Sequence, residues 1–396
     1  SDSLIKWSGL IPPDSIIIEY TTNAGNSWIK NYSGYSNDLE AKFITPDIES
    51  DSCLVRISHI SKNIINEKIN IFTDHENEII DADWSSNAQF LYSCSIDGTI
   101  RRWKFNPPGQ DKVLLENLNT LNDFSLSSDN SKLAYILSSN SVFIYNILND
   151  NVEDTLSANT EIMKKIEWNP ANEQIAAFSE DNRVVIWNYN TGNVLKNISF
   201  QGSILRDISW NMQGTELAVA DFSGNISIID GSSLNIINEF NIGFNGINAI
   251  DWNASGSYLV CVTEDTKFAI WEAATGNKVK EFIDKTAPIL DVTWNKEEDI
   301  IATSNNSRQI KLWRPDEFEP VYIYAQNNEK VNALEWSSES SKLASANING
   351  DIHVWDLDDI PFQNRILEQD TSGSFWSIKK INMELNDIIF NPLTIK

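Results

Sequence analysis

The stretch Ile79-Ile80-Asp81-Ala82-Asp83-Trp84 ends in a tryptophan that starts a regular series. Steps of 42 residues reach a tryptophan or leucine each time: Trp84, Leu126, Trp168, Trp210, Trp252, Trp294 and Trp336. A second series begins 19 residues after the first and runs Trp103, Tyr145, Trp187, Ile229, Trp271, Trp313 and Trp355. Seven copies of one period without a slip indicate seven copies of one structural repeat.

Each repeat has the pattern of four short strands. The positions two and five residues before the first marker are apolar in every copy, as Ile79 and Ala82 are in the first. Turn residues separate an apolar run (258–262 in one copy), an alternating run (309–313 in another) and a fourth run (278–280). Period-two alternation between turns predicts strands. One such sheet cannot bury both of its faces alone, so the copies are expected to pack radially as a propeller.

Two segments carry a family signature. Residues 94–103 are Cys-Ser-Ile-Asp-Gly-Thr-Ile-Arg-Arg-Trp, and residues 352–356 are Ile-His-Val-Trp-Asp. Both resemble the signature of the WD-repeat family. The resemblance covers about 290 of the 396 residues, and it implies an all-β fold with a seven-bladed β-propeller at 75–367.

The first repeat contains a polar set that the family often has. In WD-repeat proteins a histidine nine residues before the first marker is commonly bonded to an Asp of the second turn. Only the first repeat has both, as His75 and Asp97, and Ser93 and Trp103 are expected to complete a structural network. The other copies have Asn117, Asn159, Gln201, Gly243, Lys285 and Asn327 at the histidine position. Most blades are therefore expected to rely on apolar packing and ladder hydrogen bonds alone.

One set of charged residues recurs with the repeat. Three residues before the first marker stand Asp81, Asp123, Lys165, Asp207, Ala249, Asp291 and Ala333. Symmetry predicts that they lie on the innermost strands, near the mouth of a central channel. The four Asp residues and Lys165 are thus candidate binding residues for a cation or a basic side chain. In the alternative, each Asp caps a backbone N–H where the chain enters its strand. We expect no cofactor, with calcium as the one exception considered, and assign no metal ligands.

Residues 1–74 do not follow the repeat. Short strands are expected at 4–7, 15–21, 27–30, 40–43, 52–58 and 67–72, which suits a small β-sandwich. Residues 18–28 resemble a hairpin of immunoglobulin-like or fibronectin-like modules in large bacterial surface and secreted proteins, where a run such as 53–58 forms a late strand. The hairpin also resembles the structural Asp-box turn of sialidases. Residues 368–396 are expected to be an extension, either the start of another β-module or a tail packed on the propeller.

Two segments compete for the outer strand of the last blade. Residues 68–72 and 362–366 both match the register of the outer-strand run 278–282. In the WD-repeat family the N-terminal strand usually completes the last blade. We expect instead that 362–367 serves blade seven and that 68–72 belongs to the preceding domain.

Charge and composition exclude several functions. The chain has 30 Lys and Arg against 56 Asp and Glu, a net charge of −26. Such a chain repels phosphate backbones and anionic lipid, which argues against nucleic acid and membrane surfaces as partners. No apolar stretch approaches the roughly 20 residues of a membrane helix. The three cysteines have no CxxC spacing, the three histidines are scattered, and no catalytic motif occurs. We therefore expect no enzymatic activity.

These features predict a non-enzymatic scaffold that binds protein partners, set within a larger extracytoplasmic bacterial protein, extracellular or on the cell surface. The start at Ser1 without a methionine suggests an excised segment whose targeting sequence is missing. One alternative is an intracellular, cytoplasmic WD-repeat scaffold of a multiprotein complex. Another is a glycan-binding or hydrolytic propeller, which would need convergent carboxylates and exposed aromatic residues. The partner's identity cannot be derived from a fold that hosts many functions.

Overall fold

A computed structural model describes residues 70–356, apart from 106, 159, 244–245, 298, 318, 325–328 and 340, and the backbone of eight strands outside that range. The chain divides into two units. Residues 65–360 form the propeller unit, and residues 1–64 with 361–396 form the terminal unit. All the elements of the described residues are strands, and among these residues no helix is long and apolar enough to cross a membrane.

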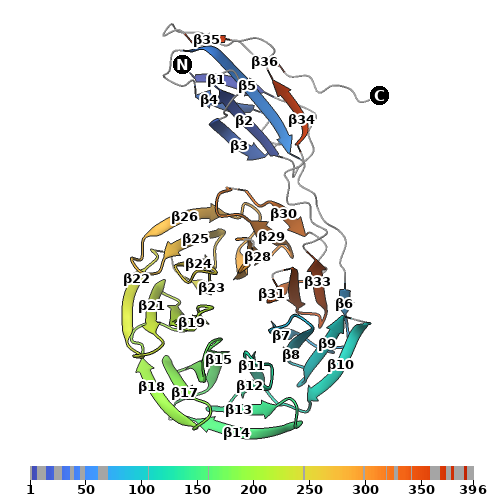
Figure 1. Ribbon diagram of the computed structural model, residues 1–396, viewed down its shortest axis with the longest axis vertical. Helices are drawn as coiled ribbons and strands as arrows, with labels where there is room; N and C mark the ends of the chain where they lie inside the picture. Colours follow the sequence, from blue (N-terminus) through green and yellow to red (C-terminus); the bar gives the residue numbers. More distant parts are fainter. Residues whose placement is uncertain are drawn as a thin grey trace. The chain divides into compact units, whose positions relative to one another are not determined.

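The propeller unit consists of seven four-stranded antiparallel sheets arranged as blades around one centre (Figure 1). Each blade starts with its innermost strand. Blades one and two comprise β7 (Ile79–Trp84), β8 (Phe90–Ser95), β9 (Ile100–Phe105) and β10 (Pro108–Leu115), then β11 (Leu121–Leu126), β12 (Lys132–Leu137), β13 (Ser141–Asn146) and β14 (Asn151–Ser157). Blades three and four comprise β15 (Met163–Trp168), β16 (Gln174–Ser179), β17 (Arg183–Asn188) and β18 (Asn193–Ser199), then β19 (Leu205–Trp210), β20 (Glu216–Asp221), β21 (Asn225–Asp230) and β22 (Ile236–Asn241).

Blades five and six follow the same order. They comprise β23 (Ile247–Trp252), β24 (Tyr258–Thr263), β25 (Lys267–Glu272) and β26 (Lys278–Ile283), then β27 (Ile289–Trp294), β28 (Ile301–Asn305), β29 (Ile310–Trp313) and β30 (Tyr322–Tyr324). Blade seven comprises β31 (Val331–Trp336), β32 (Lys342–Asn347), β33 (Ile352–Asp356) and, as its outer strand, β6 (Asn70–Phe72). The predicted seven-bladed propeller is confirmed.

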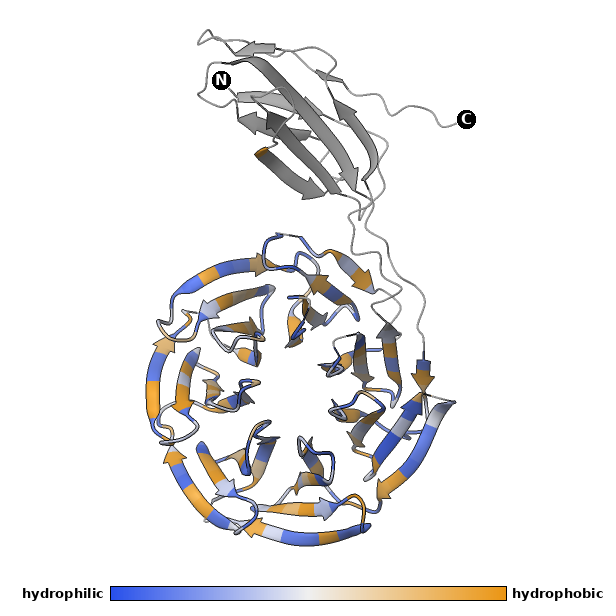
Figure 2. Cartoon of the chain, viewed as in Figure 1, coloured by the Kyte–Doolittle hydropathy of each residue, from blue (hydrophilic) through white to orange (hydrophobic). Residues whose placement is uncertain are grey.

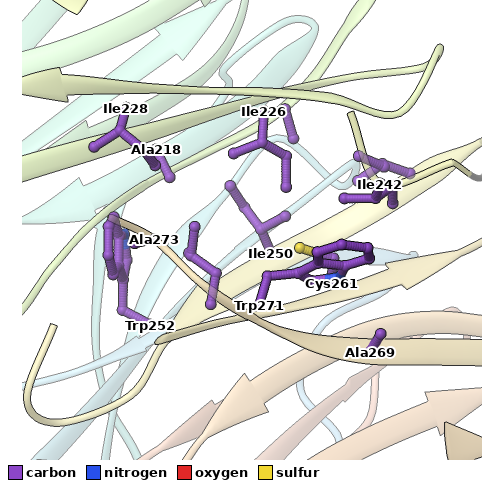
Figure 3. Close-up of a cluster of buried hydrophobic side chains, with 13 residues drawn as sticks. Ala218, Ile226, Ile228, Ile242, Ile250, Trp252, Cys261, Ala269, Trp271 and Ala273 are labelled. Atoms are coloured by element: carbon purple, nitrogen blue, oxygen red, sulfur yellow. The ribbon is translucent and has the colours of Figure 1, made fainter. Parts of the chain in front are cut away.

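The blades are held together by apolar layers between neighbouring sheets. One layer joins Ile226 and Ile228 of blade four to Ile250, Trp252 and Trp271 of blade five (Figure 3). Trp252 is fully buried, and Trp271 is 6% exposed. Each such side chain contributes about 1.5–3 kcal/mol by its burial. The two marker series of the sequence are therefore residues of these layers between blades, which is why they recur once per blade.

A register shift interrupts the pairing of the two innermost strands at the same place in every blade. In blade one it lies between Ile79 and Asp81, and in blade four between Leu205 and Asp207. The same shift occurs in the other five blades. A β-bulge bends its strand and changes the direction of the side chains that follow it. The candidate site residues come directly after this bulge.

The ring closes through its N-terminal strand. β6 pairs with β33, with Phe72 opposite Ile352 and Asn70 opposite Val354. The expectation that 362–367 would complete blade seven, and that 68–72 would belong to the preceding domain, was wrong. Phe72 is 3% exposed and stacks on Trp103 of blade one, with ring centroids 5.1 Å apart. The N-terminal strand thus fills the layer between the last and first blades and covers a sheet edge that would otherwise be free.

The turn between β32 and β33 of blade seven packs against the chain that enters blade one. Gly350, between β32 and β33, has a φ of +87°. A Cβ at this position would lie 2.5 Å from the backbone oxygen of His75. Any residue other than glycine would therefore be strained and would also push against the chain that enters blade one.

The terminal unit is described by its backbone alone. Its strands are β1 (Asp2–Lys6), β2 (Ser15–Thr21), β3 (Ile29–Tyr35), β4 (Glu40–Ile44), β5 (Ser50–Ile60), β34 (Ile366–Thr371), β35 (Trp376–Ile378) and β36 (Ile388–Ile389). One sheet has the order β3-β2-β5-β34 with β35 also on β5, and a second has the order β36-β1-β4. The segment expected to be an extension thus adds strands to sheets built from residues 2–60. The propeller is inserted between β5 and β34, where Ile60 pairs with Ile366. The predicted β-sandwich depends on residues outside the described set and stays a prediction.

The hydropathy of the propeller strands follows their burial. In Figure 2, apolar and polar segments alternate along most strands of the ring. β8 has almost continuous burial from Leu91 to Ser95, whereas β14 is exposed at all of its residues except Leu156. Second strands such as β12, β16 and β20 are buried at most of their residues, while the outer strands β14, β18 and β22 are exposed at most of theirs.

Candidate functional site

The seven innermost strands bring the recurring charged position together around the propeller axis (Figure 1). We call this set the first axial ring: Asp81, Asp123, Lys165, Asp207, Ala249, Asp291 and Ala333. All five of the predicted candidate binding residues therefore occupy equivalent places in their blades. Asp123 and Asp207 are 5% and 2% exposed, and Asp81, Lys165 and Asp291 are partly buried.

The carboxylates of the first axial ring join neighbouring blades. Asp207 accepts the backbone N–H of Ile250 at 2.7 Å, and this residue lies in the next blade. Asp123 accepts the N–H of Ile166 at 2.8 Å, and Asp291 that of Leu334 at 2.7 Å. Asp207 also accepts the N–H of Ile208, on its own strand, at 2.9 Å. The expected N–H capping is present, but most of the bonds cross to the following blade, where they replace ladder bonds that the innermost strands cannot make with each other.

Lys165 supplies the positive charge of the first axial ring. Its Nζ lies 2.5 Å from Asp207 Oδ1, and its side chain is 40% exposed while that of Asp207 is 3% exposed. Burial alone would lower the pKa of Lys165, but the carboxylates of Asp207, Asp123 and Asp81 outweigh it and raise that pKa well above its usual value. The lysine is therefore charged, and it compensates several buried carboxylates at once.

A second axial ring lies two residues further along the same strands, and the sequence analysis missed it. Its members are Asp83, Ser125, Glu167, Ser209, Asp251, Thr293 and Glu335. Four of these side chains accept the N–H of the first-marker residue in the next blade. The pairs are Asp83 with Leu126 at 3.0 Å, Ser125 with Trp168 at 3.0 Å, Glu167 with Trp210 at 2.9 Å and Asp251 with Trp294 at 2.6 Å. Residues i and i+2 of a strand share a face, so the 42-residue step applied to Asp83 would have found this ring.

Burial changes the acidity of both rings. It raises the pKa of Asp83 and of Asp291 to about 7. Burial, the largest cause, also raises the pKa of Asp123, Glu167 and Glu335 well above their usual values. A raised pKa means that these carboxyls keep their protons to a higher pH than exposed carboxyls do. This reduces the repulsion that the acidic groups gathered around one axis would otherwise produce.

The axial carboxylates do not form a compact metal-binding group. Among the described residues, no three His, Cys, Asp or Glu side chains lie close enough together to hold a metal ion. Asp251 is engaged by Lys296, 2.8 Å away, in addition to the N–H of Trp294. The arrangement supplies hydrogen bonds between neighbouring blades.

The predicted polar residues of blade one form a connected network. His75 Nδ1 lies 2.8 Å from Asp97 Oδ2, and His75 Nε2 lies 2.7 Å from Ser93 Oγ. Trp103 donates its indole N–H to the same Ser93 oxygen at 2.8 Å. Burial lowers the pKa of His75 despite the nearby Asp97. The histidine is buried within the blade and fixes the second turn to the chain that enters it, which is a structural arrangement.

Blade six has its own buried polar network, at a place where the sequence pattern did not predict one. Lys311 Nζ lies 2.6 Å from Asp284 Oδ1, and the two side chains are 1% and 0% exposed. Thr286 accepts a bond from Lys311 at 2.7 Å, and Asn305 donates to Asp284 at 2.8 Å. Burial lowers the pKa of Lys311, although Asp284 opposes this. Asp284 lies one residue before the histidine position, so a search at that fixed position missed it.

Two family models match the propeller region. Residues 66–104, which include β6 and most of blade one, match the model described as WD domain, G-beta repeat. Residues 166–255 and 292–382 match the model described as Anaphase-promoting complex subunit 4 WD40 domain. The ring is a WD-repeat β-propeller. Blade one of this WD-repeat propeller is the copy with the His75–Asp97 pair, and both residues of the pair lie within the matched residues 66–104. A comparison with curated protein sequences finds no match to the chain.

Proposed function

We propose that the WD-repeat propeller is a non-enzymatic platform that binds other proteins through its connecting segments. WD-repeat propellers typically serve as protein-interaction scaffolds. The observation that carries the proposal is a ring of rigid blades with large apolar side chains exposed on its turns. Ile96, Leu148, Ile204 and Met212 are 54%, 82%, 65% and 57% exposed. Exposed side chains on loops that a rigid scaffold positions are well suited to recognition.

The strand order divides these four residues between two faces. In an antiparallel sheet successive turns alternate between the two ends of the strands. Ile96 follows the second strand of its blade and Ile204 precedes the first strand of its blade, so both lie on one face. Leu148 follows a third strand and Met212 a first strand, so both lie on the opposite face. Blade four thus has one exposed apolar residue on each face, Ile204 on one and Met212 on the other.

The test uses this pair in the full chain. Immobilised wild-type, Ile204→Asp and Met212→Asp proteins would be exposed to extract from the source cells, and bound proteins quantified by mass spectrometry after cross-linking. We expect the amount of one bound partner to fall at least about tenfold for one variant and to stay unchanged for the other. The reason is that a buried charge is costly in an apolar contact with a partner. Equal melting temperatures would show that the fold is intact. A bound set identical for the wild type, both variants and heat-denatured protein would contradict the proposal.

For the terminal unit we propose an immunoglobulin-like β-sandwich and an extracytoplasmic setting. Support comes from the resemblance of residues 18–28 and 53–58 to such modules. These stretches overlap β2 and β5, which pair with Tyr20 opposite Val55, and the unit contains two separate sheets. Treatment of intact cells with protease should digest the protein if it is at the surface. Full protection until the cells are lysed would contradict this setting.

A further inference from the structure

The outer strands of blades three, four and five expose large apolar side chains. We call this set the outer band: Val194, Leu195, Ile236, Ile237, Val279 and Ile283, on β18, β22 and β26. Leu195, Ile237 and Val279 are 43%, 55% and 56% exposed and occupy the same place in successive repeats. Apolar segments are visible on these three strands along the circumference of the ring (Figure 2).

Hydrogen bonds between neighbouring blades link the three strands of the outer band. Lys196 of β18 bonds Asn235, next to β22, at 3.1 Å. Asn238 of β22 donates to the backbone oxygen of Ala273, in the turn before β26, at 2.7 Å. The three strands are thus tied in sequence along the circumference (Figure 1).

The edge of β22, the central strand of the outer band, has less protection than most other outer strands of the ring. β22 is the last strand of its sheet, and among the described strands it pairs with β21 alone. The outer strands of blades six and seven have three residues each. That of blade one begins with Pro108, and two register shifts interrupt its pairing. β14 of blade two carries Glu153 and Asp154. Short length, proline, irregular pairing and charge all discourage edge-to-edge pairing. β22 has six residues, no proline, a single register shift and one charged residue, Glu239.

Charge indicates what covers the outer band. The chain has a net charge of −26, so two copies repel each other over most of their surfaces. The three outer strands carry three lysines and two glutamates: Lys196, Lys278, Lys280, Glu239 and Glu281. The neighbouring turns 211–215, 231–235, 253–257 and 273–277 contain no charged residue. This is therefore a sector where two acidic copies can approach closely.

We infer that the outer band is the contact surface between two copies of this chain. β22 lies at its centre and would pair antiparallel with β22 of the second copy about a two-fold axis, which places Ile237 of both copies in the contact. A two-fold interface uses the same patch on each copy, and an antiparallel pair of identical strands has this symmetry. The surface differs from the turns proposed to bind other proteins.

The test is the mass of the full chain in solution, measured by sedimentation equilibrium from about 1 to 100 µM, a range that spans typical weak dimers. We expect a dimer for the wild type, and at least about tenfold weaker association for Ile237→Lys, because two lysines would then face each other at the axis. Ile204→Lys is the matched control, since Ile204 is 65% exposed on the same blade but outside the outer band. It should dimerise like the wild type.

Salt and cross-linking provide independent readouts. Raising the salt concentration screens the repulsion between acidic copies, so it should tighten the dimer. Ile237→Cys should form a disulfide-linked dimer on oxidation, while Ile204→Cys should not. A wild type that stays monomeric throughout, or an Ile237→Lys variant that dimerises as well as the wild type, would overturn the inference. Either result would leave the capture of other proteins by the turns unaffected.

Discussion

Trp84 of blade one donates its indole N–H to the backbone oxygen of Glu335 in blade seven, over 3.1 Å. The same bond joins Trp252 to Ser209 at 2.8 Å and Trp336 to Thr293 at 3.3 Å in the interior of the ring. Near the axis, the junction between the two ends of the repeat array is therefore built like the junctions at Trp252 and Trp336. At the circumference it depends on three residues of β6.

Replacement of Phe72 by alanine should lower the free energy of unfolding by about 3–5 kcal/mol, because it opens a cavity in the layer that closes the ring. Ile71 is the matched control on the same strand, since it is 51% exposed. Ile71→Ala should change stability by about 0.5 kcal/mol or less. Urea unfolding followed by tryptophan fluorescence measures both. Equal effects of the two substitutions would mean that β6 does not close the ring.

Lys311→Met should destabilise blade six by about 3–5 kcal/mol, since it leaves the buried carboxylate of Asp284 without its cation. The double variant Lys311→Met, Asp284→Leu removes both charges and should recover most of that loss. Thermal unfolding of the two single variants and the double variant gives the coupling energy. Additive losses would show that the two groups do not depend on each other.

Stability should decrease as the pH rises from about 5 to 8. The pKa of Asp83 and of Asp291 is about 7 in the fold, against about 3.9 in an unfolded chain. The folded chain thus binds more protons between these values, and the stabilisation they provide is lost as the pH rises through 7. Below about pH 4, carboxyls with a lowered pKa, such as Asp284, act in the opposite direction.

The variant Asp83→Asn mimics the protonated side chain, so its melting temperature should depend less on pH than that of the wild type. The free energy of unfolding of the variant, measured relative to that of the wild type, should be about 1–2 kcal/mol higher at pH 8 than at pH 5. Asp154→Asn removes one exposed carboxylate and controls for net charge. If both variants have the same pH profile, overall repulsion rather than the axial ring causes the dependence.

Lys165→Met should destabilise the propeller by about 2–4 kcal/mol at pH 8 and by less at pH 5, where more of the axial carboxyls are protonated. The adjacent Lys164 is exposed and pairs with Glu180 at 2.6 Å. Lys164→Met removes the same charge and should cost about 0.5 kcal/mol or less at either pH. A loss for Lys165→Met that is equal at the two pH values would contradict its role as counter-charge to the ring.

The fold was largely predictable because the 42-residue period carries it. Marker residues such as Trp252 and Trp313 are fully buried, and radial packing buries the faces of seven equivalent four-stranded sheets. The place of the first axial ring followed from the same period. The blade-one network was also predictable, since His75 and Asp97 stand at family positions.

Other features depend on contacts that a repeat alignment does not contain. The choice between 68–72 and 362–366 could not be made from alternation, because both segments have the same pattern. It is decided by the pocket that Phe72 fills against Trp103. The destination of the Asp123 and Asp207 bonds depends on the spacing between innermost strands of adjacent blades. The Asp284–Lys311 pair combines two positions that the family pattern does not pair.

Insertion of the propeller between β5 and β34 imposes an order on folding. In the unfolded chain, pairing of Ile60 with Ile366 would close a loop of more than 300 residues. Once β6 pairs with β33 at Asn70 and Val354, only the two short connecting segments remain to be closed. Loop-closure entropy favours the second route by about 2 kcal/mol. The ring is thus a template on which the split sheet of the other unit assembles late, so a chain whose last blade fails to close should leave that sheet incomplete.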